Sequence, residues 1–204
     1  MTAPLIALSR HRLSVDGNGV TTLVCFHGCP LRCQYCLNSQ CLEPEGIWQV
    51  VTPEELLATT MIDDLYFQAT GGGICFGGGE PLLRSDFIKS FCQLCPSVWT
   101  IYLESSLAVP QHHLTAVAPF VTHYYIDVKD MNPDIYQRYT GQTPDKMLKN
   151  LQWLADQGLQ QKVTIRLPLI RDFNTEADRS ASKAKLENLG FTDFDLFDYV
   201  INDH

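Results

Sequence analysis

The sequence has no long hydrophobic run and no dense cluster of positive charge. None of its apolar stretches reaches the roughly 18 residues that suggest a membrane-spanning helix, and the stretch Leu5 to Leu8 is too short for a signal-peptide core. The 15 Lys and Arg residues are outnumbered by 23 Asp and Glu residues and form no run that could follow a phosphate backbone. We therefore expect a cytoplasmic protein that binds neither membranes nor nucleic acid.

The composition is that of a folded domain. The 204 residues are 45% hydrophobic and only 19% charged, which is sufficient for one domain with a substantial core. Eight cysteines occur in a chain without an export signal. In a reducing compartment, thiols serve as ligands or nucleophiles rather than as disulfides. The cysteine content therefore favours a metal site or an iron-sulfur cluster.

Three of the cysteines lie in one loop. Cys29, Cys33 and Cys36 have C-x3-C-x2-C spacing, which can bring three thiolates around one compact cluster. A 4Fe-4S cluster normally takes four cysteine ligands, so three would leave one iron open to another ligand. By the logic that applies to zinc, an open coordination position is typical of catalytic rather than structural sites.

Other interpretations of the cysteines remain open. The three cysteines could belong to a structural zinc site completed by His27, Cys25 or Cys41, or could simply be buried as small apolar residues. A non-catalytic iron-sulfur or zinc protein would need a fourth ligand, for which Cys25 and Cys41 are the candidates. Zinc sites usually comprise two separated pairs, which counts against this alternative. Cys92 and Cys95 have ligand spacing, but they are expected at a helix end without a second pair, so packing is the favoured interpretation.

Strand-like and helix-like segments alternate along the chain. We expect six strands, at 21–27, 73–76, 98–104, 122–128, 162–167 and 194–200. Helices are expected at 52–66, 85–95 and 111–118, at a short segment opened by Asn132-Pro133, and at 144–157 and 175–189. Thr52, Ser85 and Thr175 are the expected N-caps, with Glu55 and Asp178 completing capping boxes at the first and the last. This alternation predicts right-handed crossovers and a parallel sheet with outer helices. A complete eight-unit barrel needs about 250 residues, so we predict an α/β fold, an open (β/α)6 partial TIM barrel, as a single domain over 1–204.

Polar and glycine-rich segments follow the carboxyl ends of four predicted strands. They are the cysteine loop at 25–41, the run Gly77 to Glu80, the run Glu104 to Ser106 and the run Asp127 to Lys129. Loops at this edge of a parallel sheet form the site in related α/β architectures. We therefore expect these segments to contribute to one site.

Together these motifs resemble the radical S-adenosylmethionine (SAM) enzymes and, among them, the activating enzymes of glycyl-radical proteins. The resemblance extends over nearly the whole chain. It is carried by Ser14 to Gly19, Gly28-Cys29-x3-Cys33-x-Tyr35-Cys36-x-Asn38, Gly78-Gly79-Glu80, Ile126 to Lys129 with Met131-Asn132, and Ile165-Arg166. The cysteine and glycine-glutamate motifs are highly specific at this separation.

The resemblance implies a reaction and its partners. Cys29, Cys33 and Cys36 would hold a 4Fe-4S cluster whose open iron chelates the amino and carboxylate groups of SAM. An electron from a reductant such as flavodoxin or ferredoxin would cleave SAM to a 5'-deoxyadenosyl radical. The radical would take hydrogen from a glycine of a partner glycyl-radical enzyme or, in a rival interpretation, from a peptide or small metabolite.

The resemblance also implies a set of cofactor-binding residues, with no further catalytic residue assigned. Gly78 and Gly79 would let a backbone edge approach SAM, and Glu80 would lie near its amino group. Tyr35 would shield the cluster from water. The full expected set is Tyr35, Asn38, Gly78, Gly79, Glu80, Ser105, Asp127, Lys129 and Arg166.

Three positions depart from the family pattern. Leu37 replaces a histidine, and Asp198-Tyr199-Val200 replaces Pro-Tyr-His, so we expect an adenosine contact to be missing. Glu104-Ser105-Ser106-Leu107 replaces Asp-Thr-Asn-Gly and keeps a carboxylate and a hydroxyl without the glycine turn. Because the sequence ends soon after the last predicted strand, we expect a more open site or one closed by a partner.

Overall fold

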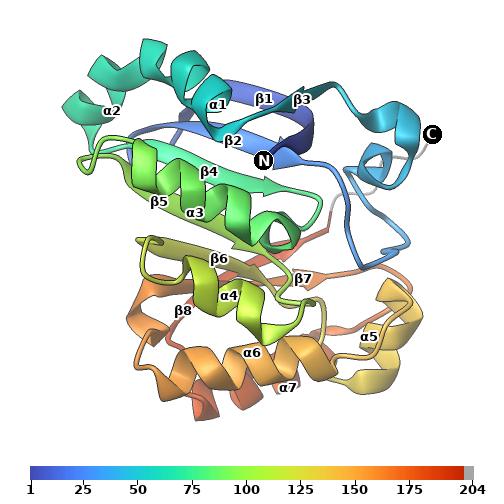
Figure 1. The fold of residues 1–204 in the computed structure, drawn as a ribbon. Coiled ribbons are helices and arrows are strands. Elements are labelled where there is room, and N and C mark those ends of the chain that lie inside the picture. The colour runs from blue at the N-terminus through green and yellow to red at the C-terminus, as the bar shows by residue number, and fades with distance from the viewer. Residues whose placement is uncertain (200–204) are drawn as a thin grey trace. The chain divides into compact units, whose positions relative to one another are not determined.

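The computed structural model describes residues 1–199 as alternating strands and helices (Figure 1). The strands are β1 (Ala3–Leu13), β2 (Val20–Phe26), β3 (Gln49–Val51), β4 (Gly73–Gly78), β5 (Thr100–Ser105), β6 (His123–Asp127), β7 (Val163–Leu169) and β8 (Asp193–Asp198). The α-helices are α1 (Pro53–Thr60), α2 (Asp64–Thr70), α3 (Ser85–Leu94), α4 (Gln111–Val117), α5 (Pro133–Thr140), α6 (Asp145–Asp156) and α7 (Glu176–Asn188).

The chain divides into two compact units. The first unit comprises Met1–Cys29, Asn38–Ser105 and His112–Tyr124. The second comprises Pro30–Leu37, Ser106–Gln111 and Tyr125–His204. The cysteine loop therefore contributes to both units, with Cys29 in the first and Cys33 and Cys36 in the second.

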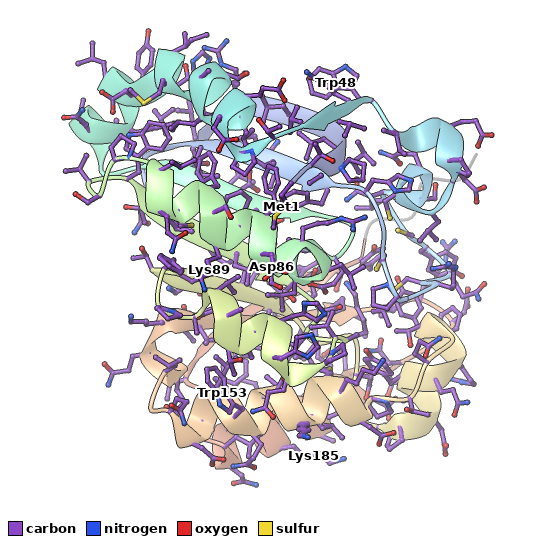
Figure 2. The ribbon with its side chains drawn as sticks, in the orientation of Figure 1. Met1, Trp48, Asp86, Lys89, Trp153 and Lys185 are labelled. Atoms are coloured by element: carbon purple, nitrogen blue, oxygen red, sulfur yellow. The ribbon has the colours of Figure 1, made fainter. Side chains whose placement is uncertain are left out.

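The first unit is built on a mixed sheet. Its strand order is β3-β1-β2-β4-β5, with β1 antiparallel to β2 and β3, and with β2, β4 and β5 parallel. Helix α3 covers this sheet (Figure 1), because Phe87 packs on Phe26 with ring centroids 5.6 Å apart and Phe91 packs on Phe76 at 5.5 Å. The opposite side of α3 is exposed and charged, as Asp86 and Lys89 show in Figure 2.

The second unit pairs β7 with β8 in parallel, from Thr164 opposite Asp193 to Leu169 opposite Asp198. Helix α6 buries Met147, Leu151 and Leu154, which recur at helical spacing. The buried Asn150 donates from Nδ2 to the carbonyl oxygens of Leu107 and Val109 at 2.8 and 2.9 Å. These bonds attach the segment after β5 to α6.

The predicted architecture is confirmed: the protein is an α/β protein with a parallel sheet and outer helices. β3 and β8 are edge strands, so the sheet is not closed. Each of the six predicted strands has a counterpart, although Val200, the predicted end of the last one, lies outside the described residues. Within residues 1–199, no helix has the length and apolar character needed to span a membrane.

Strands β1 and β3 were not predicted. The second half of β1 is polar, which obscured it in the sequence. Arg10 donates from Nη2 to Asp63 at 2.6 Å, and the His11 ring lies 2.8 Å from the same carboxylate, whose side chain is fully buried. The polar half of β1 thus satisfies a buried charge that is distant in sequence.

Two helix predictions need correction. The helix opened by the Thr52 and Glu55 capping box ends at Thr60, and a 3-10 turn at Met61–Asp63 separates it from α2, so it does not continue to Tyr66. Ser85 is not the N-cap of α3 but its first residue, and its hydroxyl pairs with His113 Nδ1 at 2.8 Å. The predicted Thr175 cap of α7 is confirmed, with Asp178 completing a capping box.

Candidate functional site

The cysteine loop begins where β2 ends, in the first unit. The Gly28 N–H donates to the Cys41 carbonyl at 2.9 Å, and the Cys41 N–H donates to the Asn38 carbonyl at 2.8 Å. Cys25 and Cys41 form a buried cluster with Ile6, and the partly exposed Cys29 packs against it. The backbone around Cys29 is therefore fixed by the returning segment of the same loop.

The Gly78-Gly79-Glu80 run lies against this loop. The Gly79 N–H donates to the Phe26 carbonyl at 2.9 Å, and the Glu80 N–H donates to the Gly28 carbonyl at 2.8 Å. Asn38 adds a bond from Nδ2 to the Gly78 carbonyl at 3.1 Å. The sequence motifs around Cys29 and Glu80 are thus joined by backbone hydrogen bonds.

The glycines of this run are required by the chain's own backbone. Gly78 has a φ of +94°, and a Cβ there would lie 2.6 Å from Cys25 Cα. A Cβ on Gly79 would lie 2.3 Å from the Gly28 carbonyl oxygen. Such separations are far below van der Waals contact, so only glycine permits β2 and the run to approach this closely.

Glu80 and Ser105 meet in the interior of the first unit. Both residues are buried. Glu80 Oε1 accepts a hydrogen bond from Ser105 Oγ at 2.7 Å and another from the Leu82 N–H at 3.1 Å. Since a buried carboxylate is costly unless it is hydrogen-bonded, these two donors hold Glu80 in one orientation directly after Gly79.

A second charged group of the first unit was missed by sequence reasoning. The buried Asp16 is paired with Arg12, and Tyr102 Oη accepts from the Asn18 N–H at 3.0 Å. Burial, the Glu104 carboxylate and Asp16 together raise the pKa of Cys25 to about 11. Arg12 is only four residues before Asp16, but the sequence does not show that Asp16 is buried and therefore needs a cation.

Cys33 and Cys36 belong to the second unit, where the end of α5 holds their loop. The Arg32 N–H donates to the Thr140 carbonyl at 2.8 Å, and the Gln34 N–H donates to the Tyr139 carbonyl at 3.1 Å. Gly141 ends α5 in the left-handed conformation, with a φ of +74°. The last turn of a helix has carbonyls without partners in the helix, and here the cysteine loop satisfies two carbonyls of that turn.

Tyr35 lies in an aromatic cluster, which we define as Tyr35, Tyr139 and Phe173. The Tyr35 ring is edge-on to Phe173, with centroids 5.7 Å apart, and tilted against Tyr139 at 6.3 Å. Tyr139 and Phe173 are 5.0 Å apart. The Tyr35 hydroxyl also reaches Asp172 at 3.4 Å. The cluster fixes the chain between Cys33 and Cys36, while the role of Tyr35 in shielding a cofactor stays a prediction.

Lys129 and Asp127 are brought together beside Cys33. The Lys129 Nζ lies 3.6 Å from Asp127 Oδ2 and 5.7 Å from the Tyr199 ring centroid. Burial acts to lower the pKa of Lys129, but Asp127, Cys33 and Tyr199 outweigh it, so that pKa is raised. Burial raises the pKa of the Cys33 thiol to about 11, against the opposing effect of the Lys129 cation. Lys129 therefore favours the thiolate form that metal binding requires.

Arg166 has other partners. Its guanidinium lies 4.6 Å from the Tyr125 ring centroid, and its Nε lies 3.8 Å from Asp195 Oδ2. These contacts account for a mostly buried cation on β7. They leave the predicted contact of Arg166 with SAM as a prediction.

The expected site residues therefore fall into two groups. The first unit holds Cys29, Asn38, Gly78, Gly79, Glu80 and Ser105, and the second holds Cys33, Tyr35, Cys36, Asp127, Lys129 and Arg166. Among residues 1–199, no three His, Cys, Asp or Glu side chains form a group that could hold a metal ion. The donor set itself, three partly exposed thiols on one loop with a buried cation beside Cys33, has the chemistry of an iron-sulfur ligand set.

The alternative ligands have their own contacts. The His27 ring lies 2.8 Å from the Glu43 carbonyl oxygen, and Cys25 and Cys41 are buried in an apolar cluster. The Cys95 thiol donates to the Cys92 carbonyl at 3.7 Å, and burial raises the pKa of Cys92 to about 12. These environments are consistent with packing for Cys92 and Cys95.

Comparison with known proteins assigns the motifs to a family. The family model described as Radical SAM superfamily matches residues 23–183. The (2S)-3-sulfopropanediol dehydratase activating enzyme of Klebsiella oxytoca is 34% identical over 85% of this chain and 74% of that protein. The indoleacetate decarboxylase activating enzyme of Tractidigestivibacter scatoligenes is 29% identical, with 73% of this chain aligned; the chain spans only 49% of its length. The crystal structure of Streptococcus suis SuiB has a TM-score of 0.65 at 11% identity, over 87% of this chain and 39% of that one, and shows similarity of fold.

Proposed function

Because the chain belongs to the radical SAM superfamily, we propose that Cys29, Cys33 and Cys36 hold a 4Fe-4S cluster and that the protein cleaves SAM reductively. The observation that carries this proposal is the pair of backbone bonds, Gly79 to Phe26 and Glu80 to Gly28, that joins the two most specific motifs. The family match runs through both units, which supports the proposal that residues 1–204 are one radical SAM domain.

Different residues of the chain would have different roles in this reaction. When bound, the cluster supplies the electron that splits a carbon–sulfur bond of SAM; the protein supplies orientation and exclusion of competing reactions. Glu80, held by Ser105 and Leu82, offers a fixed carboxylate for the amino group of SAM. Lys129 stabilises negative charge at Cys33, and the aromatic cluster keeps water from the loop between Cys33 and Cys36.

We further propose that the hydrogen donor is a glycine of a partner glycyl-radical enzyme. Support comes from the two curated relatives, both of which are named activating enzymes of other enzymes. The reductant would be a small electron carrier of the flavodoxin or ferredoxin class. Asn38, Gly78, Gly79, Asp127 and Arg166 are proposed to complete the SAM pocket.

The cleavage proposal is tested on an anaerobically reconstituted protein that comprises residues 1–204. With dithionite and SAM, it should release 5'-deoxyadenosine and methionine in equal amounts. Cys33→Ser should abolish both products, whereas Cys92→Ser, a matched exchange at a packing cysteine, should leave them unchanged. Zinc without iron in anaerobic preparations, or undiminished cleavage by Cys33→Ser, would contradict the proposal.

The non-catalytic alternative predicts a fourth protein ligand. It expects Cys25→Ser or Cys41→Ser to lose the cluster in the same way as Cys33→Ser. Our proposal expects both variants to keep iron and SAM cleavage, apart from the destabilisation caused by a hydroxyl in the cluster with Ile6. The iron content per chain of these two variants distinguishes the non-catalytic alternative, which expects iron to be lost, from our proposal, which expects it to be kept.

The donor is identified by electron paramagnetic resonance (EPR). Reduced protein and SAM are mixed with candidate glycyl-radical enzymes, beginning with any that a neighbouring gene encodes. A glycyl doublet should appear on the partner and disappear when its radical glycine is replaced by alanine. Formation of 5'-deoxyadenosine without that doublet, together with a changed peptide or metabolite, would favour the rival donor.

A further inference from the structure

The outer surface beside the cysteine loop is positively charged. Segments 30–37 and 141–150 of the second unit contain three basic side chains and one acidic side chain. They are Arg32, Lys146, Lys149 and Asp145, and all four are exposed. Taking them from the chain totals of 15 basic and 23 acidic residues leaves 12 basic and 22 acidic residues elsewhere. A local excess of positive charge therefore lies on a protein that is otherwise strongly acidic.

The fold gathers these cations where α5 ends and α6 begins. A Cβ added to Gly141, which ends α5, would lie 3.7 Å from the Arg32 Cβ. Pro30 and Lys146 line the same hollow, which has a volume of about 110 Å³. Lys149 is three residues after Lys146 in α6, and residues at this spacing are neighbours on a helix surface. We call Arg32, Lys146 and Lys149, together with this hollow, the basic surface.

The basic surface adjoins the proposed cluster ligands. Pro30 directly follows Cys29, and Arg32 directly precedes Cys33. A cluster held by these cysteines would therefore lie a short distance beneath the surface. Because the rate of electron transfer falls steeply with distance, a protein that reduces the cluster must dock close to its ligands.

We propose that the basic surface docks the small electron-carrier protein that reduces the cluster, and that this carrier presents acidic side chains to it. The inference rests on the proposed function, which requires an electron from outside the chain. Since the chain has a net charge of -8, most of its surface repels an acidic carrier, and the basic surface steers the carrier to the cysteine loop. Redox partners commonly form small, transient interfaces, and the hollow beside Lys146 can receive one carboxylate of the carrier.

The test compares Lys146→Glu and the double variant Lys146→Glu/Lys149→Glu with Lys162→Glu, all in the protein of residues 1–204. Lys162 is exposed and directly precedes β7, at the amino end of that strand and away from the site loops. With photoreduced acidic flavodoxin at low salt, the KM for flavodoxin in SAM cleavage should rise about tenfold in Lys146→Glu and further in the double variant. Lys162→Glu should keep the native KM. With dithionite, which needs no docking site, all three variants should cleave SAM at the native rate.

A binding measurement gives a second criterion that does not depend on turnover. In isothermal titration calorimetry, oxidised flavodoxin should bind the iron-free native protein with a Kd that rises with salt, and the double variant should bind it more weakly.

An unchanged KM and Kd in the double variant would overturn the inference. Loss of glycyl-radical formation with dithionite would also overturn it, because the basic surface would then hold the hydrogen donor. Loss of self-association in sedimentation would overturn it in favour of a second copy of this chain. Failure of the native protein to cleave SAM with dithionite would instead overturn the proposed function.

Discussion

The two units hold their parts of the proposed site in different ways. In the first unit, the positions of Gly79 and Glu80 are set by backbone bonds to β2 and its following loop, at distances that leave no room for a side chain on Gly79. In the second unit, Cys33 is surrounded by the Lys129 cation, the Asp127 carboxylate and aromatic rings. The arrangement in the first unit fixes the backbone geometry around Gly79 and Glu80. The arrangement in the second unit sets the charge around Cys33 and its access to solvent.

This difference teaches which substitutions each unit can tolerate. A backbone contact is lost all at once when an extra atom intrudes, because close-packed interiors cannot yield smoothly. An electrostatic environment changes by degrees, because each charge contributes separately. We therefore expect abrupt losses from changes in the first unit and graded shifts from changes in the second.

The largest effect is expected from Gly79→Ala. Its Cβ would lie 2.3 Å from the Gly28 carbonyl oxygen, so the bonds to Phe26 and Gly28 must be displaced. Because a displacement of about 1 Å can cost about 100-fold in rate, SAM cleavage should fall by at least that factor. The free energy of unfolding should also fall by about 1–3 kcal/mol.

Gly71→Ala is the matched control for that loss. Gly71 ends α2 with a φ of +69°, and a Cβ there meets nothing within 4 Å. It should cost about 1 kcal/mol of unfolding free energy, from backbone conformation alone, and leave cleavage unchanged in a discontinuous product assay. Equal cleavage by the two alanine variants would break the proposed contrast between the units.

In the second unit, Asp127→Asn should destabilise more than Lys129→Met. The side chain of Lys129 is only 11% exposed, so removing the Asp127 charge leaves a nearly buried cation with weaker compensation. Because Asp127 is itself 32% exposed, the expected loss is about 1–2 kcal/mol, below the range for fully buried pairs. Urea unfolding of the iron-free protein measures the loss of unfolding free energy in both variants. A larger loss in Lys129→Met than in Asp127→Asn would contradict the proposed role of Asp127 in compensating the Lys129 charge.

A smaller loss is expected when the Glu80 carboxylate loses one donor. Ser105→Ala removes the 2.7 Å bond to Glu80 Oε1 and should cost about 0.5–1.5 kcal/mol, because the Leu82 N–H remains a donor to the same oxygen. Ser106→Ala, the neighbouring exchange at a less buried serine, removes a long 3.4 Å bond from the Ala108 N–H and should cost less than Ser105→Ala. A coupling of at least about 0.5 kcal/mol between Ser105→Ala and Glu80→Gln in a double-mutant cycle would sharpen the assignment, whereas additive losses would argue against a direct bond.

The smallest effect is a pH dependence in the first unit. Hydrogen bonds from Arg10, opposed by burial, and then from His11 lower the pKa of Asp63 below its usual value. The resulting stability is fully present above the ordinary Asp pKa of about 3.9 and is lost as pH falls through the lower folded pKa. The stability difference between native protein and Asp63→Asn should therefore shrink below about pH 4 in urea titrations, and a constant difference would contradict this assignment.

The sequence predicted the parallel αβ units because their signals are local. The capping boxes of Thr52 with Glu55 and of Thr175 with Asp178 can be predicted directly from the spacing of these residues, and both are present in the structure. Strand β1 could not be predicted in this way, because its polar half is explained only by Asp63, which is distant in sequence. The break in the helix after Thr60 follows the same logic, since it places the Asp63 carboxylate in the interior.

For the site, residue identity was more predictable than residue environment. The spacing of Cys29, Cys33 and Cys36 indicated the ligand set. The fold then connects Glu80 to Gly28, next to Cys29, and Asn38 to Gly78 by hydrogen bonds. The contact that makes Gly79 necessary is with Gly28, which no local pattern reveals.

The attachment of the cysteine loop to α5 has a consequence for how a disturbance would spread through the second unit. The Arg32 and Gln34 N–H groups are bonded to the Thr140 and Tyr139 carbonyls at the end of α5. A substitution that unwinds the last turn of α5 would therefore release the backbone on both sides of Cys33, far earlier in the sequence.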